Sequence, residues 1–213
     1  MKQIIVLATK NKEKTREIKE LLKDCFVELK DLKDFGPIPE VIEDGKTFDE
    51  NAYKKASFTA RVLGYPAMAD DSGLCVKALK KAPGIFSARY AGKNATDEDN
   101  VKKLLKELKD KENRQAYFQC TISIAVPTGA ALTYEAVSKG IIAKKQIGEN
   151  GFGYDPVFFY PQLNKTFAQL TTKEKGQISH RGKALKQVVQ EIDKILDWLD
   201  INMPQFAKID CKK

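Results

Sequence analysis

Residues 3–29 read QIIVLATKNKEKTREIKELLKDCFVEL, and this stretch decides the fold class. Residues 3–8 are almost wholly apolar, which predicts a buried strand, whereas residues 12–23 place their apolar side chains on one face and predict a helix. Residues 26–29 predict a second strand. A strand–helix–strand unit implies a crossover helix and at least one parallel pair of strands, so we expect an α/β fold.

Helix and strand signals continue along the rest of the chain. Thr47 is a good N-cap with Glu50 three residues later, which predicts a capping box and a helix that runs to Leu63 and stops at Gly64. The alternating residues 116–126 predict one arm of a hairpin. The other predicted elements are strands at 67–69, 74–78, 132–139 and 157–160, a helix from Thr96 through Leu108, and one long helix from Ser179.

Together these elements predict a mixed sheet with helices on its faces, bent into two lobes around a cleft. No internal repeat or clear linker divides residues 1–202, so we expect a single two-lobed domain there. Residues 203–213 are expected to form a polar C-terminal tail.

The composition favours a folded protein with an anionic ligand. The 213 residues are 42% apolar, which is enough for a sizeable core and argues against disorder. The formal net charge of +8 suits a polyanionic ligand, although solvated helix faces account for most individual lysines.

The cysteines and the apolar runs indicate the compartment. The four cysteines are scattered, and no pair has the spacing of a zinc site. Cys75 and Cys120 lie in apolar runs and are expected to be buried thiols, so a reducing compartment is favoured. The apolar run at residues 4–8 is too short for a signal peptide, and no run approaches the length of a membrane span. We therefore expect a cytoplasmic protein without a membrane partner.

Neighbouring carboxylates mark a candidate metal site. Glu40, Glu43 and Asp44 cluster before the second predicted helix, and Asp70 and Asp71 are adjacent. Adjacent carboxylates repel unless a cation or a proton lies between them, and Mg²⁺ prefers oxygen ligands. The alternative is a solvated hairpin turn between the strands at 67–69 and 74–78, because Asp, Ser and Gly favour turns. Successive strand side chains point oppositely, so only one of the two aspartates can face a cleft directly.

A candidate phosphate site lies between the first strand and the first helix. Thr9 and Asn11 lie at this junction, where free backbone N–H groups favour phosphate, and Lys10, Lys12 and Lys14 add positive charge. The glycines of a P-loop are missing. The alternative is that Asn11 serves only as a helix N-cap.

Glycines surround two aromatic residues further along the chain. Gly148, Gly151 and Gly153 allow close approach around Phe152 and Tyr154, which could stack on a base or belong to the core.

The most basic candidate cluster contains Lys175, His180 and Arg181, and His180 is the only histidine. Arg181 and Lys183 fall in the first turn of the last predicted helix, against its dipole. A bound anion or a polar ligand would remove that conflict, and the alternative is a surface turn without a partner.

Five segments, in this order, resemble the motifs of the inosine/xanthosine triphosphate pyrophosphatases, which remove deaminated purine nucleotides. The segments are FDENAYKKA at 48–56, ADDSG at 69–73, PGIFSARYAG at 83–92, GFGYDP at 151–156 and ISHRG at 178–182. The resemblance covers roughly residues 4–199. One departure is Lys10, where bacterial members usually carry glycine.

The resemblance implies an elongated mixed sheet with flanking helices, two lobes around a central nucleotide-binding cleft, and usually a homodimer. It also implies Mg²⁺-dependent hydrolysis of ITP, dITP and XTP to the monophosphate and pyrophosphate. Asp71 would be the catalytic carboxylate and a metal ligand, and Glu43 a second metal ligand. The substrate-binding residues would be Thr9, Lys10, Asn11, Lys12, Glu13 and Lys14 at the phosphates, Lys55 and Ser72, and, around the nucleotide and especially its base, Phe152, Gly153, Tyr154, Asp155, Lys175, His180 and Arg181.

Two other functions stay open at this point. One is a related pyrophosphatase with another base preference, such as the septum-inhibitor (Maf-like) family acting on pyrimidine nucleotides. The other is a nucleic-acid-binding module that uses the charge of +8. Because the basic residues are dispersed and form no recognised nucleic-acid motif, we expect a nucleoside triphosphate partner and no nucleic acid.

Overall fold

Strand β1 (Gln3–Leu7) pairs in parallel with β2 (Val27–Asp31), and helix α1 (Lys12–Leu22) connects them. The predicted strand–helix–strand unit is therefore confirmed in the computed structural model, which describes residues 2–204. The side chain of Asn11 caps α1 by accepting hydrogen bonds from the backbone N–H groups of Glu13 and Lys14, at 2.9 and 3.1 Å. The N-cap expected of Asn11 is thus present.

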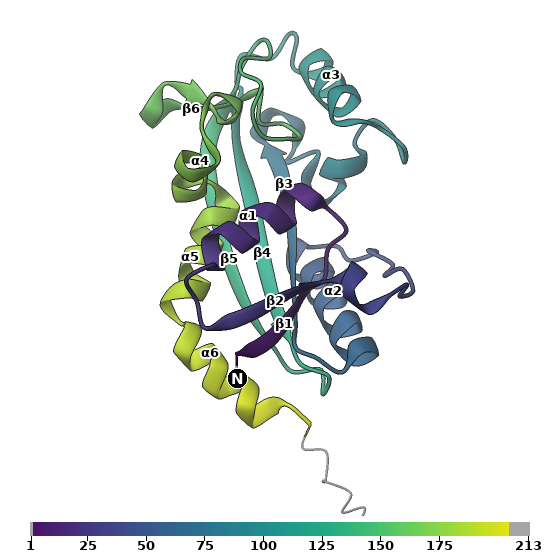
Figure 1. Ribbon diagram of the computed structural model, residues 1–213. Helices are drawn as coiled ribbons and strands as arrows, with labels where there is room; N and C mark the ends of the chain where they lie inside the picture. Colours follow the sequence, from purple (N-terminus) through teal and green to yellow (C-terminus); the bar gives the residue numbers. More distant parts are fainter. Residues whose placement is uncertain (1, 205–213) are drawn as a thin grey trace, which may run out of the picture.

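The sheet has seven strands in the order β2-β1-β3-β4-β5-β6-β7. Its other strands are β3 (Ala67–Val76), β4 (Gln115–Ala125), β5 (Ala131–Ile142), β6 (Phe158–Tyr160) and β7 (Lys165–Thr166). Strand β1 is parallel to β2 and β3, and all later neighbours are antiparallel, so the sheet is mixed as predicted. The long β4–β5 hairpin runs through the length of the molecule and gives it an elongated shape (Figure 1).

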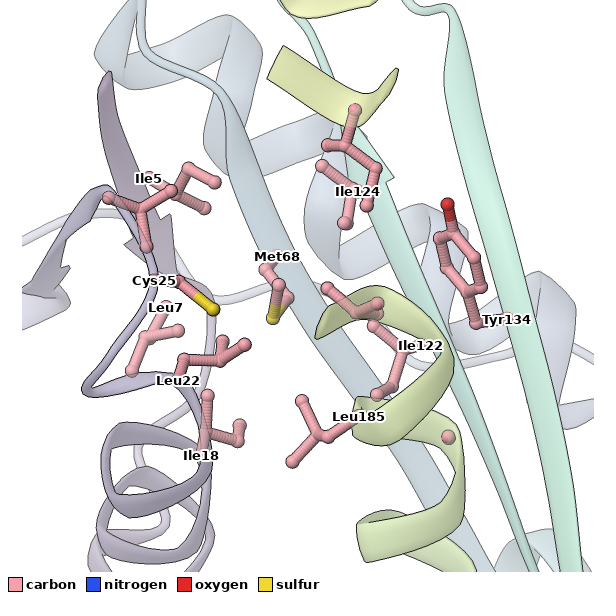
Figure 2. Close-up of a cluster of buried hydrophobic side chains, with 14 of the residues drawn as sticks. Ile5, Leu7, Ile18, Leu22, Cys25, Met68, Ile122, Ile124, Tyr134 and Leu185 are labelled. Carbon is pink, nitrogen blue, oxygen red and sulfur yellow. The ribbon is translucent and has the colours of Figure 1, made fainter. Parts of the chain in front are cut away.

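The two ends of the sheet carry separate apolar clusters. The first contains Ile18 and Leu22 of α1, Met68 of β3, and Ile122 and Ile124 of β4, together with apolar side chains of two C-terminal helices, α5 (His180–Gln190) and α6 (Ile192–Asn202). Figure 2 shows side chains of α1, β3, β4 and α5 from this cluster pointing toward one another. The second cluster joins helix α3 (Asp97–Glu107) to the opposite end of β4 and to β6. The two apolar clusters lie at opposite ends of the β4–β5 hairpin, which fits the prediction of two lobes.

Helix α2 (Phe48–Leu63) begins after Thr47 and ends at Gly64, as predicted. Gly64 adopts a left-handed conformation with φ of 73°, which favours glycine. The hydroxyl of Thr47 accepts from the Glu50 N–H at 3.1 Å, but the Glu50 carboxylate accepts from the Lys46 N–H at 2.7 Å. The reciprocal half of the predicted capping box is therefore wrong, because Glu50 reaches past the N-cap residue.

The two short strands predicted at 67–69 and 74–78 are one continuous strand, β3, and the hairpin turn between them does not exist. Every residue of β3, from Ala67 to Val76, is paired in register with β4. The ladder overrides the turn preference of Asp, Ser and Gly because it satisfies the backbone groups of a buried strand. Gly73 serves close packing here, since a Cβ atom at this position would lie 2.3 Å from the carbonyl oxygen of Gly84.

The single long helix predicted from Ser179 is also wrong, because the chain breaks at Glu191 into α5 and α6. Glu191 has φ of −110° and ψ of 13°, and its carboxylate accepts from the Tyr134 hydroxyl at 3.1 Å. The break turns α6 so that Ile195 and Leu199 enter the same core as Leu185.

The remaining predictions have mixed outcomes. The predicted hairpin and the helix capped by Thr96 are present, whereas β7 and the short helix α4 (Thr172–Ile178) were missed. Cys75 and Cys120 are buried and free, as expected. Within residues 2–204, no helix is long and apolar enough to cross a membrane. Residues 205–213 of the predicted tail lie outside the described residues.

Candidate active site

A cleft of about 480 Å³ lies between the β1–α1 junction, α2, β3 and the loop at residues 152–155. Most of the predicted site residues line it: Thr9, Lys10, Asn11, Lys14, Glu43, Lys55, Asp71, Ser72, Phe152, Gly153, Tyr154, Asp155, Lys175, His180 and Arg181. Two do not. Lys12 lines a neighbouring basic hollow, and Glu13 forms an ion pair with Arg16.

Asp71 faces the cleft from the α2 side of β3. Its Oδ1 lies 2.8 Å from the Nζ of Lys55, and its Oδ2 accepts a 3.4 Å hydrogen bond from the side-chain amide of Asn51. Burial raises the pKa of Asp71 and outweighs the opposing effect of Lys55. The cleft therefore holds a carboxylate that is more basic than an ordinary aspartate.

Glu43 and Asp71 converge on one cation, the ammonium of Lys55. The Nζ of Lys55 lies 3.1 Å from Glu43 and 2.8 Å from Asp71. Burial lowers the pKa of Lys55, but the carboxylates of Asp71, Asp70 and Glu43 outweigh it, so the pKa is raised. Two carboxylates arranged around one positive charge can also accept a divalent cation.

The donor set limits what that cation can be. No group of three His, Cys, Asp or Glu side chains within residues 2–204 is placed to hold a metal ion. The oxygens of Glu43 and Asp71 suit Mg²⁺, which binds proteins through one or two carboxylates and completes its shell with water and substrate phosphates. These residues therefore fit a metal ion that shares its coordination with a bound phosphate.

Asp70 points to the opposite face of β3, toward α1 and α5. Its Oδ2 accepts from Nε and Nη2 of Arg181, at 3.2 and 3.0 Å, and from the Ser72 hydroxyl at 2.8 Å. The Nζ of Lys14 lies 3.1 Å from the same oxygen. Burial acts to raise the pKa of Asp70, but Lys14 and Arg181 overcome it and hold the pKa well below its usual range. The expectation that only one of the two aspartates faces the cleft is confirmed.

Glu17 is a site-associated residue that the sequence analysis missed. Its carboxylate pairs with the guanidinium of Arg181 and lies 2.9 Å from the Nζ of Lys175. Burial acts to raise the pKa of Glu17, but Arg181 and Lys175 together lower it. A signal was available, because Glu17 follows Lys14 by three residues and therefore lies on the same face of α1.

The conflict predicted between Arg181 and its helix dipole is removed by the protein itself. Arg181 is buried between Asp70 and Glu17, which raise its pKa against the effect of burial. Lys175 is paired in the same way, with Asp155 at 2.6 Å and with Glu17. A ligand anion is not needed to balance these two cations, and the alternative of an unpartnered surface turn is wrong.

The glycine–aromatic loop is held in place by hydrogen bonds. The Phe152 N–H donates to Oδ2 of Asp155 at 3.0 Å, and the Tyr154 hydroxyl donates to the Ser87 carbonyl at 2.9 Å. Gly151 has φ of 78°, and a Cβ atom there would lie 2.1 Å from the Asp155 carboxylate. Tyr154 is buried in the second apolar cluster, whereas the Phe152 ring lies 4.7 Å from the Nζ of Lys175. Both aromatics line the cleft, but Tyr154 also belongs to the apolar core, whereas Phe152 packs beside the cationic cluster.

His180 is a buried, neutral imidazole. It stacks on Phe118 with ring centroids 4.5 Å apart and planes at 10°. Burial, reinforced by Arg181 and Lys175, lowers its pKa well below the usual value for histidine. Its Nδ1 is buried without a hydrogen-bond partner among the described residues, so the ring keeps unused polar capacity beside the cleft.

Comparisons with known proteins identify similar chains. The chain is 56% identical over 197 residues to a dITP/XTP pyrophosphatase of Desulfotalea psychrophila, covering 92% of this chain and 88% of that protein. It is 58% identical over 196 residues to a protein of the same name from Syntrophobacter fumaroxidans, covering 92% and 84%.

Two solved structures are also similar to this chain. A HAM1 protein from Coxiella burnetii matches with a TM-score of 0.84 and 44% identity, over 90% of this chain and 99% of that one. The Staphylococcus aureus Ham1 protein matches with a TM-score of 0.82 and 41% identity, over 91% and 100%. The sequence profile of the Ham1 family matches residues 5–191. The predicted resemblance is thus confirmed, and the chain belongs to the Ham1 family.

Proposed function

We propose that this protein hydrolyses ITP, dITP and XTP to the nucleoside monophosphate and pyrophosphate, and so removes non-standard purines from the nucleotide pool. The observation that carries the proposal is the Asp71 carboxylate, which faces the cleft between Lys55 and Asn51 and has a raised pKa. The names of the relatives, dITP/XTP pyrophosphatases, support the same activity.

The charges divide the cleft into two ends with different chemistry. At the end formed by α4 and α5, Lys175 and Arg181 are balanced by three buried or nearly buried carboxylates: Glu17, Asp70 and Asp155. A balanced, polar site suits a neutral ligand that forms hydrogen bonds, such as a purine base. The other end contains the start of α1 and the pair Glu43–Asp71, where phosphates and a metal ion would lie.

The base end has donors left for a keto oxygen. Lys175 has three N–H donors, of which two point to Glu17 and Asp155. Arg181 has five, of which three are used by Asp70 and Glu17. Inosine and xanthine present a 6-keto acceptor, whereas adenine presents an amino donor there. Binding adenine would leave buried donors unpaired, and such mismatches discriminate strongly.

Glu43 and Asp71 would hold Mg²⁺ together with the phosphates. When bound, the ion neutralises negative charge on the triphosphate and its leaving group. The cleft lysines at positions 14, 55 and 175 have little spare positive charge for this task, since they already contact carboxylates. We therefore propose that the enzyme acts on the metal complex of the nucleotide.

The reaction is a displacement at the α-phosphorus. Asp71 accepts a proton from water while the water oxygen bonds to that phosphorus and the bond to the oxygen that bridges the α- and β-phosphorus breaks. Its raised pKa makes Asp71 a stronger base for this step. Lys55 lies 2.8 Å from Asp71, where its ammonium can turn to the phosphate oxygens as their charge develops.

We further propose that the enzyme is a cytoplasmic homodimer. A pyrimidine-specific Maf-like activity and nucleic-acid binding are the competing functions. A panel of triphosphates that includes CTP and UTP separates the first. A DNA-binding measurement at several salt concentrations separates the second, because phosphate contacts give a steep salt dependence.

The central test is phosphorus NMR of ITP turnover with Mg²⁺ in ¹⁸O-labelled water. We expect IMP and pyrophosphate, with the label in IMP, because water attacks the α-phosphorus. Asp71→Asn is the matched control for contaminating activity. Formation of IDP and orthophosphate, or label in pyrophosphate, would contradict the proposal.

A further inference from the structure

Arg89 is the one cationic side chain on the described cleft wall that has no carboxylate partner. It belongs to the short helix η3 (Gly84–Arg89), and its side chain lines the cleft. The other cationic cleft residues are paired: Lys10 with Glu40, Lys14 with Asp70, Lys55 with Glu43 and Asp71, Lys175 with Glu17 and Asp155, and Arg181 with Glu17 and Asp70. The positive charge of Arg89 is therefore available to a ligand.

The backbone around Arg89 is held in place by buried contacts. The Ser87 hydroxyl accepts from the Leu74 N–H at 2.9 Å and donates to the Gly84 carbonyl at 2.6 Å, which ties η3 to β3. The amide of Asn100 donates to the Ala88 carbonyl at 3.2 Å, which ties the same segment to α3. A cationic side chain on a fixed support binds with little loss of backbone entropy.

The guanidinium of Arg89 is supported on one face and has no protein acceptor. Its Cζ lies 5.2 Å from the centroid of the Phe86 ring, which is itself exposed. Contact with an aromatic ring uses the face of a guanidinium and leaves its edge, with five N–H donors, free. No side-chain hydrogen bond from Arg89 is formed within residues 2–204, so this edge can meet a bidentate anion.

We propose that Arg89 binds the β- and γ-phosphates of the substrate, the part that leaves as pyrophosphate. This inference rests on the proposed function. A guanidinium edge matches phosphate oxygens in geometry as well as in charge. The neutral base is a poorer partner for Arg89, because an uncompensated charge gains most from an ion of opposite sign. Arg89 is thus the protein's own positive charge for the leaving group.

The test is calorimetric binding of magnesium pyrophosphate and of IMP, separately, to wild type and to Arg89→Gln. We expect pyrophosphate to bind about 10- to 150-fold more weakly to the variant, which corresponds to about 1.5–3 kcal/mol for a charge-assisted hydrogen bond. IMP affinity should change less than about twofold. Arg61→Gln is the matched control, because Arg61 is exposed on α2, outside the cleft, and carries the same charge.

Arg89→Lys keeps the positive charge but removes the planar guanidinium edge that can bind two phosphate oxygens at once. We therefore expect an intermediate loss of pyrophosphate affinity. This variant also decides the question if Arg89→Gln does not fold. A larger loss for IMP than for pyrophosphate would place Arg89 at the nucleoside monophosphate and overturn the inference. Equal losses for the two ligands would show an effect that is not specific to the leaving group and would also overturn it, as would unchanged pyrophosphate binding or the same loss in Arg61→Gln. Calorimetry needs no turnover, so failure here is distinct from failure to hydrolyse ITP.

Discussion

Asp70 and Asp71 are adjacent carboxylates, but substitution by asparagine should affect stability at Asp70 and activity at Asp71. Asp70 is 1% exposed at its side chain, and one of its oxygens receives Arg181, Lys14 and Ser72. Asp71 has a raised pKa, so its charge is poorly stabilised by the fold. We predict that Asp70→Asn lowers stability, whereas Asp71→Asn mainly lowers activity.

The magnitude for Asp70→Asn follows from its partners. Removing one member of a buried ion pair costs about 3–5 kcal/mol, because the remaining charge stays buried. Arg181 keeps Glu17 as a partner, so we expect the lower end, about 3 kcal/mol. For a chain of this size, that corresponds to a melting temperature lower by about 6–12 °C. Asp71→Asn should cost less than Asp70→Asn, because the raised pKa of Asp71 means that folding disfavours its charged form, and Lys55 retains Glu43.

Thermal and urea unfolding, followed by circular dichroism, measure both variants against wild type. The pH gives a second criterion, because the pKa of Asp70 is lowered in the folded state. Its contribution is fully present above about pH 4, the range of an unfolded aspartate, and is lost as the pH falls through the folded pKa. The gap between wild type and Asp70→Asn should therefore shrink in acid. Equal melting temperatures for the two variants, within about 2 °C, would refute this reasoning.

Three further outcomes are expected. Asp71→Asn should lower kcat by about 10²–10⁴-fold with unchanged circular dichroism, and EDTA should stop wild-type turnover until Mg²⁺ is restored; a rate within about tenfold of wild type would remove Asp71 as the base. His180→Ala should narrow the preference for ITP over ATP by about 5- to 150-fold in kcat/KM. An unchanged ratio would assign base selection to the loop at 152–155. Because the pKa of His180 is lowered well below its usual value, its titration should give no inflection near pH 6.5 in the pH profile of kcat/KM. Gly73→Ala should destabilise the protein by about 1–3 kcal/mol, because the new Cβ would lie 2.3 Å from the Gly84 carbonyl; Gly176→Ala, whose nearest neighbour would be a flexible Leu21 methyl group at 3.4 Å, is the control that should be tolerated.

Local signals predicted much of the fold. Thr47 and Gly64 bound α2, Asn11 caps α1, and the hairpin of β4 and β5 is present where alternation placed it. These features depend on residues close together in the chain, so a window of sequence contains their cause. The order of five motifs likewise indicated the family, and most of the site residues that the resemblance implied line the cleft.

Features that depend on distant residues were missed or mistaken. The segment at 70–73 favours a turn by composition, yet it is strand because β4 pairs with all of β3. The helix predicted from Ser179 breaks at Glu191, which contacts Tyr134 on β5. Tertiary pairing supplied the deciding free energy in both cases, and no local window contains it.

The same division holds for the cleft. The sequence by itself determined which chemical groups are present: two adjacent aspartates, a basic cluster around His180 and a family of nucleotide pyrophosphatases. Only the tertiary structure decided how their charges are balanced. Glu17 lies 164 residues from Arg181 along the chain but pairs with it, and Arg89 is left without a carboxylate. Charge balance depends on distances between side chains from separate elements, and folding sets those distances only when α1, β3, η3 and α5 come together.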